Sequence, residues 1–258
     1  MLKVGIVGIS GRMGHVLWDC CLGMDSLKVV CGIDRNTDGV PVGCNVEVVE
    51  NVNDLKTVPD VFVDFTRPDC SLEVLNFAKE HHISYVLGTT GFSETQKAKI
   101  KEASRLIPVV FAANFSVGIN ILLSLIKKTA EIMQDADIEI VEAHHRYKVD
   151  APSGTALAMG EAAAAGRNVN LNDVMVAGRN GVTGERQYGT IGFSSIRGGD
   201  IVGMHNVMFC CDGERVELNH VASSRATFAR GALRAAAWLE GRKPGLYTMN
   251  DVLSLQKD

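Results

Sequence analysis

The sequence predicts an α/β protein: a doubly wound parallel sheet joined to a second, α+β domain that contains an open mixed sheet. The first part of this prediction rests on the regular alternation of apolar strand patterns and helical patterns over residues 1–114. The second part rests on four strand-like runs that follow helical patterns between residues 115 and 222. Because chain termini often lie close together, we expect residues 1–114 plus 223–258 to form one domain and residues 115–222 the other.

The composition agrees with a globular enzyme. The 258 residues are 46% hydrophobic and 22% charged, which suffices for two hydrophobic cores. The net charge of −4 argues against nucleic-acid binding, and no apolar run is long enough to predict a membrane span. The seven cysteines form no Cys-x-x-Cys pair, which favours reduced thiols in a cytoplasmic protein and no metal site.

In the first domain, six apolar runs are predicted strands and three amphipathic patterns are predicted helices. The strands are expected at residues 2–8, 27–33, 46–49, 61–65, 84–88 and 108–112. The helices are expected at residues 11–23, 69–80 and 93–104. Since crossover helices make successive strands parallel, we expect the carboxyl ends of the strands to meet at one edge, where such sheets bind ligands.

A glycine-rich turn follows the first strand. Residues 8–14 read Gly-Ile-Ser-Gly-Arg-Met-Gly, and apolar residues then continue at helical spacing. Gly8 would permit a tight turn, Gly11 would let the backbone approach a pyrophosphate, and Gly14 would let the helix pack closely on the sheet. This order of elements predicts a Rossmann-like dinucleotide site and favours a nicotinamide over a flavin.

An acidic and a basic residue end the second predicted strand. Asp34 occupies the position at which a carboxylate accepts hydrogen bonds from the adenosine ribose, which favours NADH. The adjacent Arg35 can instead hold the 2′-phosphate of NADPH. The sequence therefore leaves both cofactors, NADH and NADPH, open.

Polar turns also follow two later strands of the first domain. Asp64-Phe65-Thr66 ends the strand at 61–65, and Gly88-Thr89-Thr90-Gly91 ends the strand at 84–88. Their hydroxyls, amides and glycines suit the ribose or carboxamide of a nicotinamide. Ordinary βα loops have a similar composition, so this interpretation depends on the glycine turn.

The second domain is predicted to begin with a long helix whose apolar face runs from Ile119 to Met133. A strand near 138–142 and an Ala-rich helix at 155–165 follow, and then strands at 173–178, 190–196, 201–211 and 215–221. A last amphipathic helix, capped by Ser223 or Ser224, is expected to end near Glu240. Helices would cover one face of the open sheet, and a second copy of the chain is the simplest cover for the other.

The segment between the strand at 138–142 and the Ala-rich helix concentrates cationic groups: His144, His145, Arg146 and Lys148. Pro152 ends the preceding element, and the sequence Ser-Gly-Thr at 153–155 opens the helix with exposed N–H groups. A helix N-terminus beside a basic cluster binds anions and has proton donors at hand. A solvated basic loop is the alternative, but it gives no reason for adjacent histidines before such a turn.

These motifs resemble the 4-hydroxy-tetrahydrodipicolinate reductase (dihydrodipicolinate reductase) family. The resemblance covers essentially the whole chain, including 112–118, 222–225 and 245–253, and its most specific part is His-His-Arg-x-Lys…Pro-Ser-Gly-Thr. It implies a bacterial or plastid enzyme of the diaminopimelate route to lysine. Such an enzyme reduces a small dianionic cyclic imine acid with NADH or NADPH and is a homotetramer joined through the sheets of its second domain.

The resemblance also implies roles for individual positions. Those that match adenosine and pyrophosphate contacts are Gly8, Ile9, Ser10, Gly11, Arg12, Met13, Asp34 and Arg35. Those that match contacts near the nicotinamide are Gly88, Thr89, Thr90, Ala112, Ala113, Asn114 and Phe115, with Phe228 as a further cofactor contact. The catalytic positions are His144 and Lys148, and the substrate-binding positions are His145, Ser153, Gly154 and Thr155.

The residues themselves agree with this chemistry. A ring with two carboxylates needs fixed positive charge and N–H donors, which Lys148 and the turn at 153–155 can supply. Reduction of a conjugated imine also needs a proton at a neighbouring carbon, and an imidazole suits this role. Whether His144 or Lys148 delivers the proton stays open.

Two positions depart from the family pattern. Ile9 stands where a small Ala is common, and Met204 stands where Glu often precedes His205. Two alternative functions also remain. A related nicotinamide-dependent amino-acid dehydrogenase would give no reason for the His-His-Arg-x-Lys block, and a non-catalytic NAD-binding module would not need its proton donors.

Overall fold

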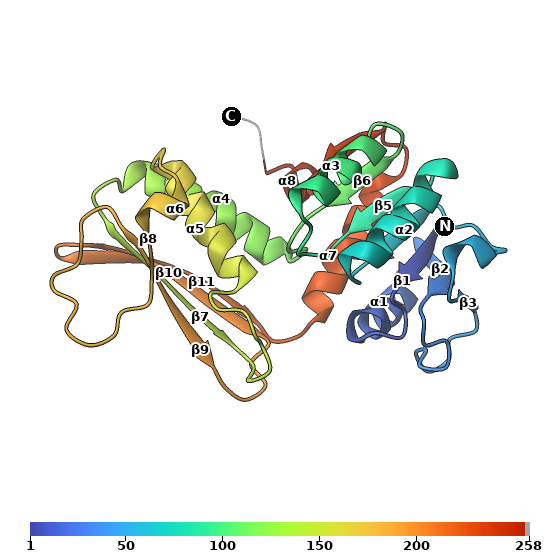
Figure 1. Ribbon diagram of the computed structural model, residues 1–258, viewed down its shortest axis with the longest axis horizontal. Coiled ribbons are helices and arrows are strands. Elements are labelled where there is room, and N and C mark those ends of the chain that lie inside the picture. The colour runs from blue at the N-terminus through green and yellow to red at the C-terminus, as the bar shows by residue number, and fades with distance from the viewer. Residues whose placement is uncertain (256–258) are drawn as a thin grey trace. The chain divides into compact units, whose positions relative to one another are not determined.

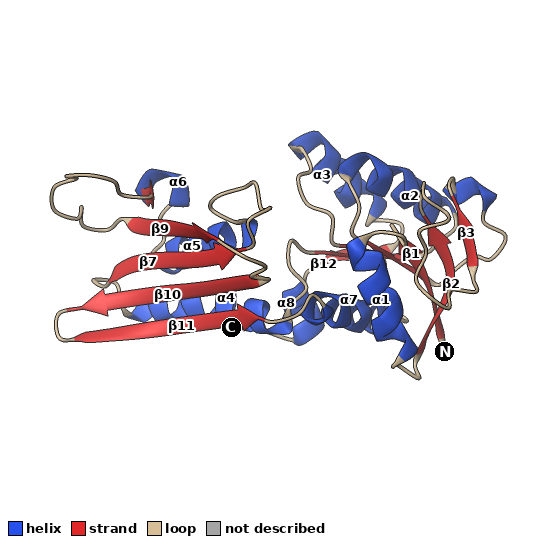
Figure 2. Cartoon of the chain, turned by 90° about the horizontal axis from the view of Figure 1, so that it is seen from below, coloured by secondary structure: helices blue, strands red, loops and turns tan. Residues whose placement is uncertain are grey.

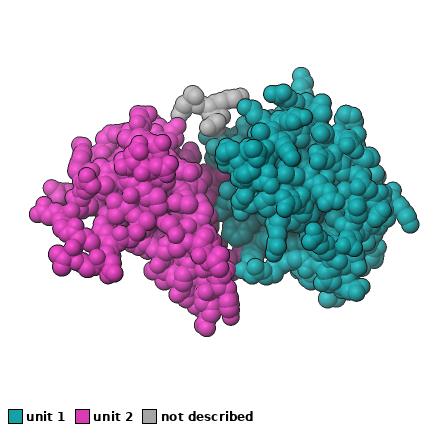
Figure 3. All heavy atoms as spheres, in the orientation of Figure 1, with its two compact units in different colours: residues 1–117, 225–258 teal, residues 118–224 magenta. Residues whose placement is uncertain are grey.

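The computed structural model describes residues 1–255. The contacts divide the chain into two compact units (Figures 1 and 3). Unit 1 consists of residues 1–117 and the residues from 225 onward, and unit 2 consists of residues 118–224.

Within the described residues, unit 1 contains a seven-stranded, entirely parallel sheet in the order β12-β6-β5-β4-β1-β2-β3. The strands are β1 (Leu2–Val7), β2 (Leu27–Ile33), β3 (Glu47–Val49), β4 (Val61–Asp64), β5 (Ser84–Leu87), β6 (Pro108–Phe111) and β12 (Gly245–Tyr247). The helices are α1 (Arg12–Leu22), the 3₁₀ turn η1 (Val52–Asp54), α2 (Pro68–Glu80), α3 (Glu94–Ala103), α7 (Ala226–Leu239) and α8 (Met249–Leu253).

Helices cover both faces of this sheet, as the doubly wound prediction requires (Figure 1). On β4, Val61 and Val63 belong to the core formed with α1 and α7, whereas Phe62 belongs to the core formed with α2 and α3. Successive side chains of a strand point to opposite faces, so a strand buried on both sides reads as a continuous apolar run. The predicted fold class is confirmed.

Some local predictions for unit 1 were wrong. The sequence did not indicate β12 or α8, which are short and place few apolar residues in a row. The expected N-cap of the last helix was Ser223 or Ser224, but α7 begins at Ala226, with Arg225 in the cap position and without a side-chain cap. Arg225 already has helical dihedral angles, φ −66° and ψ −16°, so the helical path starts after the two serines.

In the described chain, unit 2 contains a five-stranded mixed sheet in the order β11-β10-β7-β9-β8. Its strands are β7 (Asp137–His144), β8 (Met175–Ala177), β9 (Ile191–Arg197), β10 (Gly203–Cys211) and β11 (Glu214–Ala222). Its helices are α4 (Val117–Ile132), α5 (Gly154–Gly166) and α6 (Leu171–Val174). The central strand β7 pairs antiparallel with β10 and parallel with β9.

Helices α4 and α5 lie on one face of the unit 2 sheet, and the other face carries no helix of this unit among the described residues (Figure 2). Two predicted bounds differ from those observed. The expected strand at 173–178 is divided between α6 and β8, and the expected strand at 138–142 continues to His144. His144 therefore lies on a strand, and only Lys148 of the predicted catalytic pair lies on the following loop.

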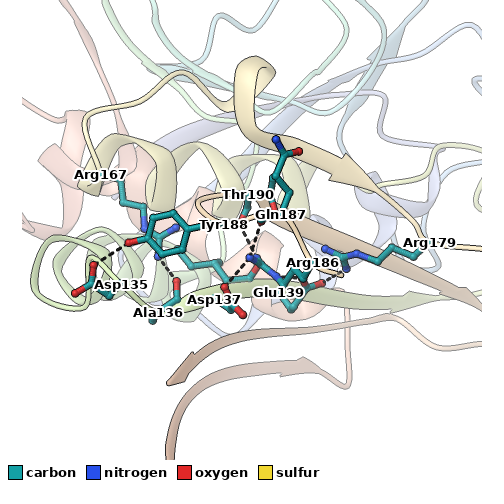
Figure 4. A network of polar contacts seen from close by, with 11 residues as sticks. Asp135, Ala136, Asp137, Glu139, Arg167, Arg179, Arg186, Gln187, Tyr188 and Thr190 are labelled. Carbon is teal, nitrogen blue, oxygen red and sulfur yellow. Dashed lines mark hydrogen bonds and ion pairs between the residues drawn. The ribbon is translucent and has the colours of Figure 1, made fainter. Parts of the chain in front are cut away.

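A long loop at residues 178–190 is held to the start of β7 by Arg186 (Figure 4). The guanidinium of Arg186 donates to the carboxylates of Asp137 (2.6 Å) and Glu139 (3.1 Å) and to the carbonyl oxygen of Thr190 (2.6 Å). Arg179 donates to the second oxygen of Glu139 at 3.0 Å. Several charge-assisted hydrogen bonds on one planar group fix its orientation, so this loop is anchored at both ends.

Candidate active site

The glycine turn of unit 1 connects β1 to α1 as predicted. Gly8 has a φ of +80°, and its amide donates to the carbonyl oxygen of Ile33 at 2.7 Å. A Cβ atom at Gly14 would lie 2.2 Å from the carbonyl oxygen of Gly8 and 2.4 Å from that of Ile9. The missing side chain at Gly14 therefore lets α1 start directly against the turn, with its first N–H groups at the edge where an anion can bind.

Ile9, in the same turn, is accommodated by a glycine on the neighbouring strand. Its side chain is buried and lies over Gly32 on β2, where an added Cβ would come within 2.7 Å of it. The glycine on the neighbouring strand thus provides the space that the larger side chain needs.

Asp34 follows β2 and holds the same turn from the other side. Its carboxylate accepts hydrogen bonds from the amides of Ser10 (3.0 Å) and Asn36 (3.0 Å). Arg35 beside it has an exposed side chain. A carboxylate has about four acceptor positions, so these two bonds leave capacity for ribose hydroxyls.

A buried carboxylate joins the loops that follow β4 and β5. Asp64 accepts hydrogen bonds from the Thr66 hydroxyl (2.6 Å), the Thr66 amide (2.8 Å), the Tyr85 hydroxyl (2.8 Å) and the Thr89 hydroxyl (3.2 Å). Burial raises the pKa of Asp64 above its usual value, although hydrogen bonds from Ser71, Thr66 and Tyr85 act in the opposite direction. Because the Thr89 hydroxyl is directed at Asp64, what Thr89 presents to a ligand is its backbone.

The remaining predicted cofactor residues lie on the loops after β5 and β6 or at the start of α7. A Cβ atom at Gly88 would lie 2.3 Å from the ring of Phe65, and the buried Phe115 packs edge-on against the same ring, 5.5 Å between centroids. The loops after β5 and β6 carry Thr90, Ala112, Ala113 and Asn114, and the first turn of α7 carries Phe228. The predicted residues on these loops follow parallel strands, so they share one edge of the sheet with the glycine turn.

On the helix-facing side of the unit 2 sheet, one row of apolar side chains is followed directly by a row of polar ones. Ile140 on β7 is level with Phe193 on β9 and Val207 on β10. Two residues further along β7, Glu142 is level with His205 on β10. Residues in register on neighbouring strands share a face, so a polar cluster directly continues the hydrophobic core.

Glu142 is the centre of this cluster and is 1% exposed. Its carboxylate receives both terminal nitrogens of Arg197 (2.7 and 2.9 Å), Nδ1 of His144 (2.5 Å) and the amide of Ser153 (3.3 Å). Burial favours a higher pKa for Glu142, but hydrogen bonds from Arg197, Ser195 and His144 outweigh it and lower that pKa to about 2. Glu142 is therefore ionised at neutral pH and can only accept hydrogen bonds.

Two imidazoles lie beside this carboxylate. Burial lowers the pKa of His144 below its usual value; Glu142 raises it again, and the charges of Lys148 and Arg197 lower it. His205 meets His144 edge-on, with ring centroids 5.0 Å apart. Burial and the neighbouring His144 lower the pKa of His205 to about 4, so His205 is neutral at neutral pH.

Ser153 connects this cluster to the N-terminus of α5. Its hydroxyl oxygen accepts a hydrogen bond from the amide of Ala156 (3.2 Å) and lies 3.2 Å from Nε2 of the neutral His205. Ser153 therefore caps α5 through its hydroxyl oxygen and is also hydrogen-bonded to His205. The helix opens with Gly154 and Thr155, as the motif predicted. A helix N-terminus of this kind can bind an anion.

The other residues of the basic motif lie on the loop after β7. Nζ of Lys148 pairs with the carboxylate of Asp150 at 2.9 Å. The ring of His145 lies 6.2 Å from that of Tyr147. The structure therefore joins His144 and Ser153 in one network. Lys148 lies on the loop and is linked to this network through Asp150, whose carbonyl oxygen accepts a hydrogen bond from Arg197.

Sequence reasoning missed three members of the cluster. Glu142 lies two residues before the histidine pair and received no role, although strand alternation places it on the same face as His144. Arg197 and His205 carried no local signal, because only the register of β9 and β10 with β7 brings them to the site.

Across residues 1–255, no three His, Cys, Asp or Glu side chains are grouped so that they could hold a metal ion. Over the same residues, no helix combines the length and the apolar character that crossing a membrane requires.

Comparisons with known proteins agree with this arrangement. The sequence matches the family models "Dihydrodipicolinate reductase, N-terminus" over residues 2–115 and "Dihydrodipicolinate reductase, C-terminus" over residues 118–253. A dipicolinate-bound dihydrodipicolinate reductase from Paenisporosarcina sp. TG-14 is 24% identical, with 96% of this chain and 97% of that chain covered and a TM-score of 0.78. A myo-inositol dehydrogenase from Corynebacterium glutamicum is 12% identical, with 93% and 89% covered and a TM-score of 0.59.

The doubly wound sheet with its glycine turn, together with a second unit that carries a polar cluster, is the arrangement of a nicotinamide-dependent oxidoreductase. The two solved structures are 24% and 12% identical to this chain and show only that the fold is shared. The two family models match residues 2–115 and 118–253 and show the family. The chain belongs to the dihydrodipicolinate reductase family. Its reaction is the NAD(P)H-dependent reduction of 4-hydroxy-tetrahydrodipicolinate in diaminopimelate and lysine biosynthesis, and the prediction of this activity is confirmed.

Proposed function

We propose that in this reduction the residues of unit 1 hold the dinucleotide and the polar cluster of unit 2 binds the dianionic substrate and protonates it. The observation that carries the proposal is the position of His144. Its Nδ1 is bound to a buried carboxylate, and it lies in one network with the residue that caps α5. A proton donor and an anion-binding helix end therefore belong to one rigid cluster.

The residues of unit 1 fit a dinucleotide. Gly8 and Gly14 leave room for the turn and the helix start that would receive a pyrophosphate. Asp34 would accept the ribose hydroxyls, and the exposed Arg35 would meet a 2′-phosphate. When bound, the nicotinamide supplies the hydride.

Two features of unit 2 suit the substrate's carboxylates. The N–H groups of Gly154 and Thr155, at the start of α5, offer donors to one of them. The ammonium of Lys148, on the adjacent loop, offers a mobile positive charge to the other, in exchange for its pairing with Asp150. His145 would add a further donor from the same loop.

His144 supplies the proton that follows hydride addition. Loss of the 4-hydroxyl group as water gives the conjugated imine. Hydride addition to this imine leaves an enamine, whose neighbouring carbon must gain a proton. An imidazolium with a pKa below its usual value gives up its proton readily. Lys148 retains the alternative role of carboxylate binding.

We also propose that the enzyme works as a cytoplasmic homotetramer in which copies of the chain cover the open sheet face. Three apolar side chains on strands of that sheet are exposed, namely Ile196 (52%), Met204 (44%) and Val221 (62%). Burying such a patch against a symmetry-related copy is favourable. Sedimentation analysis of the purified protein tests the assembly, and a monomer at micromolar concentration would contradict it.

The function is tested with the purified protein, NADH or NADPH, and freshly generated cyclic imine acid. We expect absorbance of the reduced nicotinamide to fall with this substrate. It should stay constant with oxaloacetate plus ammonia and with aspartate semialdehyde, the substrates of the related amino-acid dehydrogenases. Turnover of one of the latter, and not of the imine acid, would reject the proposal.

A further inference from the structure

The carboxylate of Glu142 determines which nitrogen of His144 carries a proton. Because Glu142 is ionised, its contact with Nδ1 at 2.5 Å requires a proton on Nδ1. In the neutral ring Nε2 is then the unprotonated nitrogen, and in the imidazolium Nε2 carries the second, transferable proton. The carboxylate thus leaves Nε2 as the nitrogen that exchanges a proton.

No side chain of residue 203 fills the space beside Nε2 of His144, because this residue is a glycine. Gly203 on β10 lies next to the imidazole, and a Cβ atom at this position would be 3.2 Å from Nε2. The lack of a side chain at Gly203 keeps the approach to Nε2 open on this side.

Arg197 holds the carboxylate itself. Its two terminal nitrogens bind the two oxygens of Glu142, and one of them also donates to the carbonyl oxygen of Asp150 at 2.6 Å. A fork of this kind fixes the plane of the carboxylate and therefore the direction of its bond to His144. It also connects β9 to the loop that carries Lys148.

We propose that Glu142 and Arg197 are positioning residues for His144: Glu142 fixes the Nδ1–H tautomer, and Arg197 fixes Glu142 and offsets its charge, so that Nε2 of His144 remains an effective acid. This inference rests on the proposed role of His144 as the proton donor.

The charges around His144 give the reason why the arginine matters. A buried carboxylate alone would stabilise the imidazolium and make it a weak acid. Burial is the largest cause that lowers the pKa of His144, and the positive charges of Lys148, itself paired with Asp150, and of Arg197 also lower it and so oppose Glu142. From β10, His205 contributes an uncharged ring. The two ionic partners of His144 therefore act on its proton affinity with opposite signs.

Because Glu142 and Arg197 act on the proton affinity of His144 with opposite signs, their variants should shift the pH profile in opposite directions. Two residues with purely structural roles would not produce opposite shifts. Turnover by a protonated donor falls as pH rises through the donor's pKa. In Glu142→Gln the anionic partner is lost, so this fall should move to lower pH and kcat should drop roughly 10²-fold, the scale of general-acid catalysis. In Arg197→Gln the cationic partner is lost, so the fall should move to higher pH.

Glu131→Gln serves as the matched control, because Glu131 is an exposed carboxylate on α4 that pairs with Lys128. It should leave kcat and its pH profile unchanged. The substrate KM should change less than kcat in Glu142→Gln, and the dissociation constant of the cofactor should not change. Shifts of both variants in the same direction, or no shift in either, would overturn the proposal.

A measurement on the resting wild-type protein covers the case in which a variant does not fold. Nitrogen-15 spectra of protein labelled at histidine report which ring nitrogen carries the proton. We expect the Nδ1–H tautomer for His144, identified by the loss of its signals in His144→Ala. An Nε2–H tautomer in an enzyme that reduces the imine acid would reject the positioning role alone. An Nδ1–H tautomer in a protein without that activity would reject the proposed function and, with it, the role of His144.

Discussion

The carboxylate of Asp34 accepts a hydrogen bond of 3.0 Å from the backbone amide of Ser10, 24 residues away in the sequence. The residue predicted to select the cofactor therefore also closes the glycine turn that would hold the pyrophosphate. Loss of Asp34 would remove its hydrogen bond to the turn and so weaken the binding of any dinucleotide. For NADH it would also remove the predicted hydrogen bonds to the ribose hydroxyls. Cofactor selectivity must be judged from a ratio of affinities.

The first prediction concerns this ratio. Asp34→Ala should weaken both cofactors but NADH more, by about tenfold, the scale of one lost hydrogen bond to a charged group. Arg35→Ala should weaken NADPH more, because the 2′-phosphate loses its partner. Fluorescence titration of both nucleotides measures the two dissociation constants. Asp38→Ala, at an exposed carboxylate of the same loop, is the control, and unchanged ratios in both variants would remove these assignments.

The second prediction concerns the start of α1. Gly14→Ala would place a Cβ 2.2 Å from a backbone oxygen, and we expect a destabilisation of about 1–3 kcal/mol together with weaker dinucleotide binding. Gly23→Ala, at the end of the same helix, is the matched control, because its nearest contact would be 3.8 Å. Urea unfolding of the two variants should separate them, and equal stabilities would contradict the packing role of Gly14.

The sheet of unit 1 could be predicted because its signals are local. A buried parallel strand is a short apolar run, and the turn after β1 requires glycines at fixed positions. The errors arose where local signals were ambiguous. Ser223 and Ser224 are good caps by residue type, but β11 continues to Ala222 and the helical path begins at Arg225.

The candidate site could be predicted only in part, for the same reason. The His144 motif and the turn at 153–155 are continuous in sequence. Arg197 lies 55 residues from Glu142, and His205 lies 52 residues from Ser153. Their contacts follow from the register of three strands, and a single sequence does not specify a register between distant segments.

The third prediction concerns the substrate's two charges. A pyridine ring with carboxylates on both sides of its nitrogen should inhibit competitively against the imine acid. The analogue with one carboxylate should bind roughly tenfold or more weakly, since a charge-assisted hydrogen bond contributes about 1.5–3 kcal/mol. Inhibition constants at fixed cofactor concentration decide the matter. Equal inhibition by both analogues would show that the second charge has no partner in the site.

The fourth prediction concerns stability in acid. The pKa of Glu142 falls from 4.5 to about 2 on folding, so its contribution to stability is complete above pH 4.5 and is lost as the pH falls towards 2. The contribution is at most about 3 kcal/mol. The stability difference between wild type and Glu142→Gln should therefore shrink across this range. Glu185→Gln, at an exposed carboxylate, should show no such trend, and a constant difference for Glu142→Gln would contradict the pKa assignment.

The last prediction separates the two catalytic candidates. His144→Ala should chiefly lower kcat, by roughly 10²- to 10⁴-fold, because a general acid acts in the transition state. Lys148→Ala should also raise the substrate KM, because a carboxylate partner is then lost in the ground state as well. Cofactor binding should be nearly unchanged in both, since the predicted dinucleotide residues belong to unit 1.

Lys127→Ala, at an exposed lysine of α4, controls for the loss of a positive charge from unit 2. Turnover from absorbance and cofactor binding from fluorescence should be measured on the same preparations. Intact turnover in both variants would reject the mechanism. Equal loss of cofactor binding in both variants would show that the basic motif belongs to the dinucleotide site. Cofactor affinity is measured without substrate, so the His144 and Lys148 side chains can affect it only if they lie in that site.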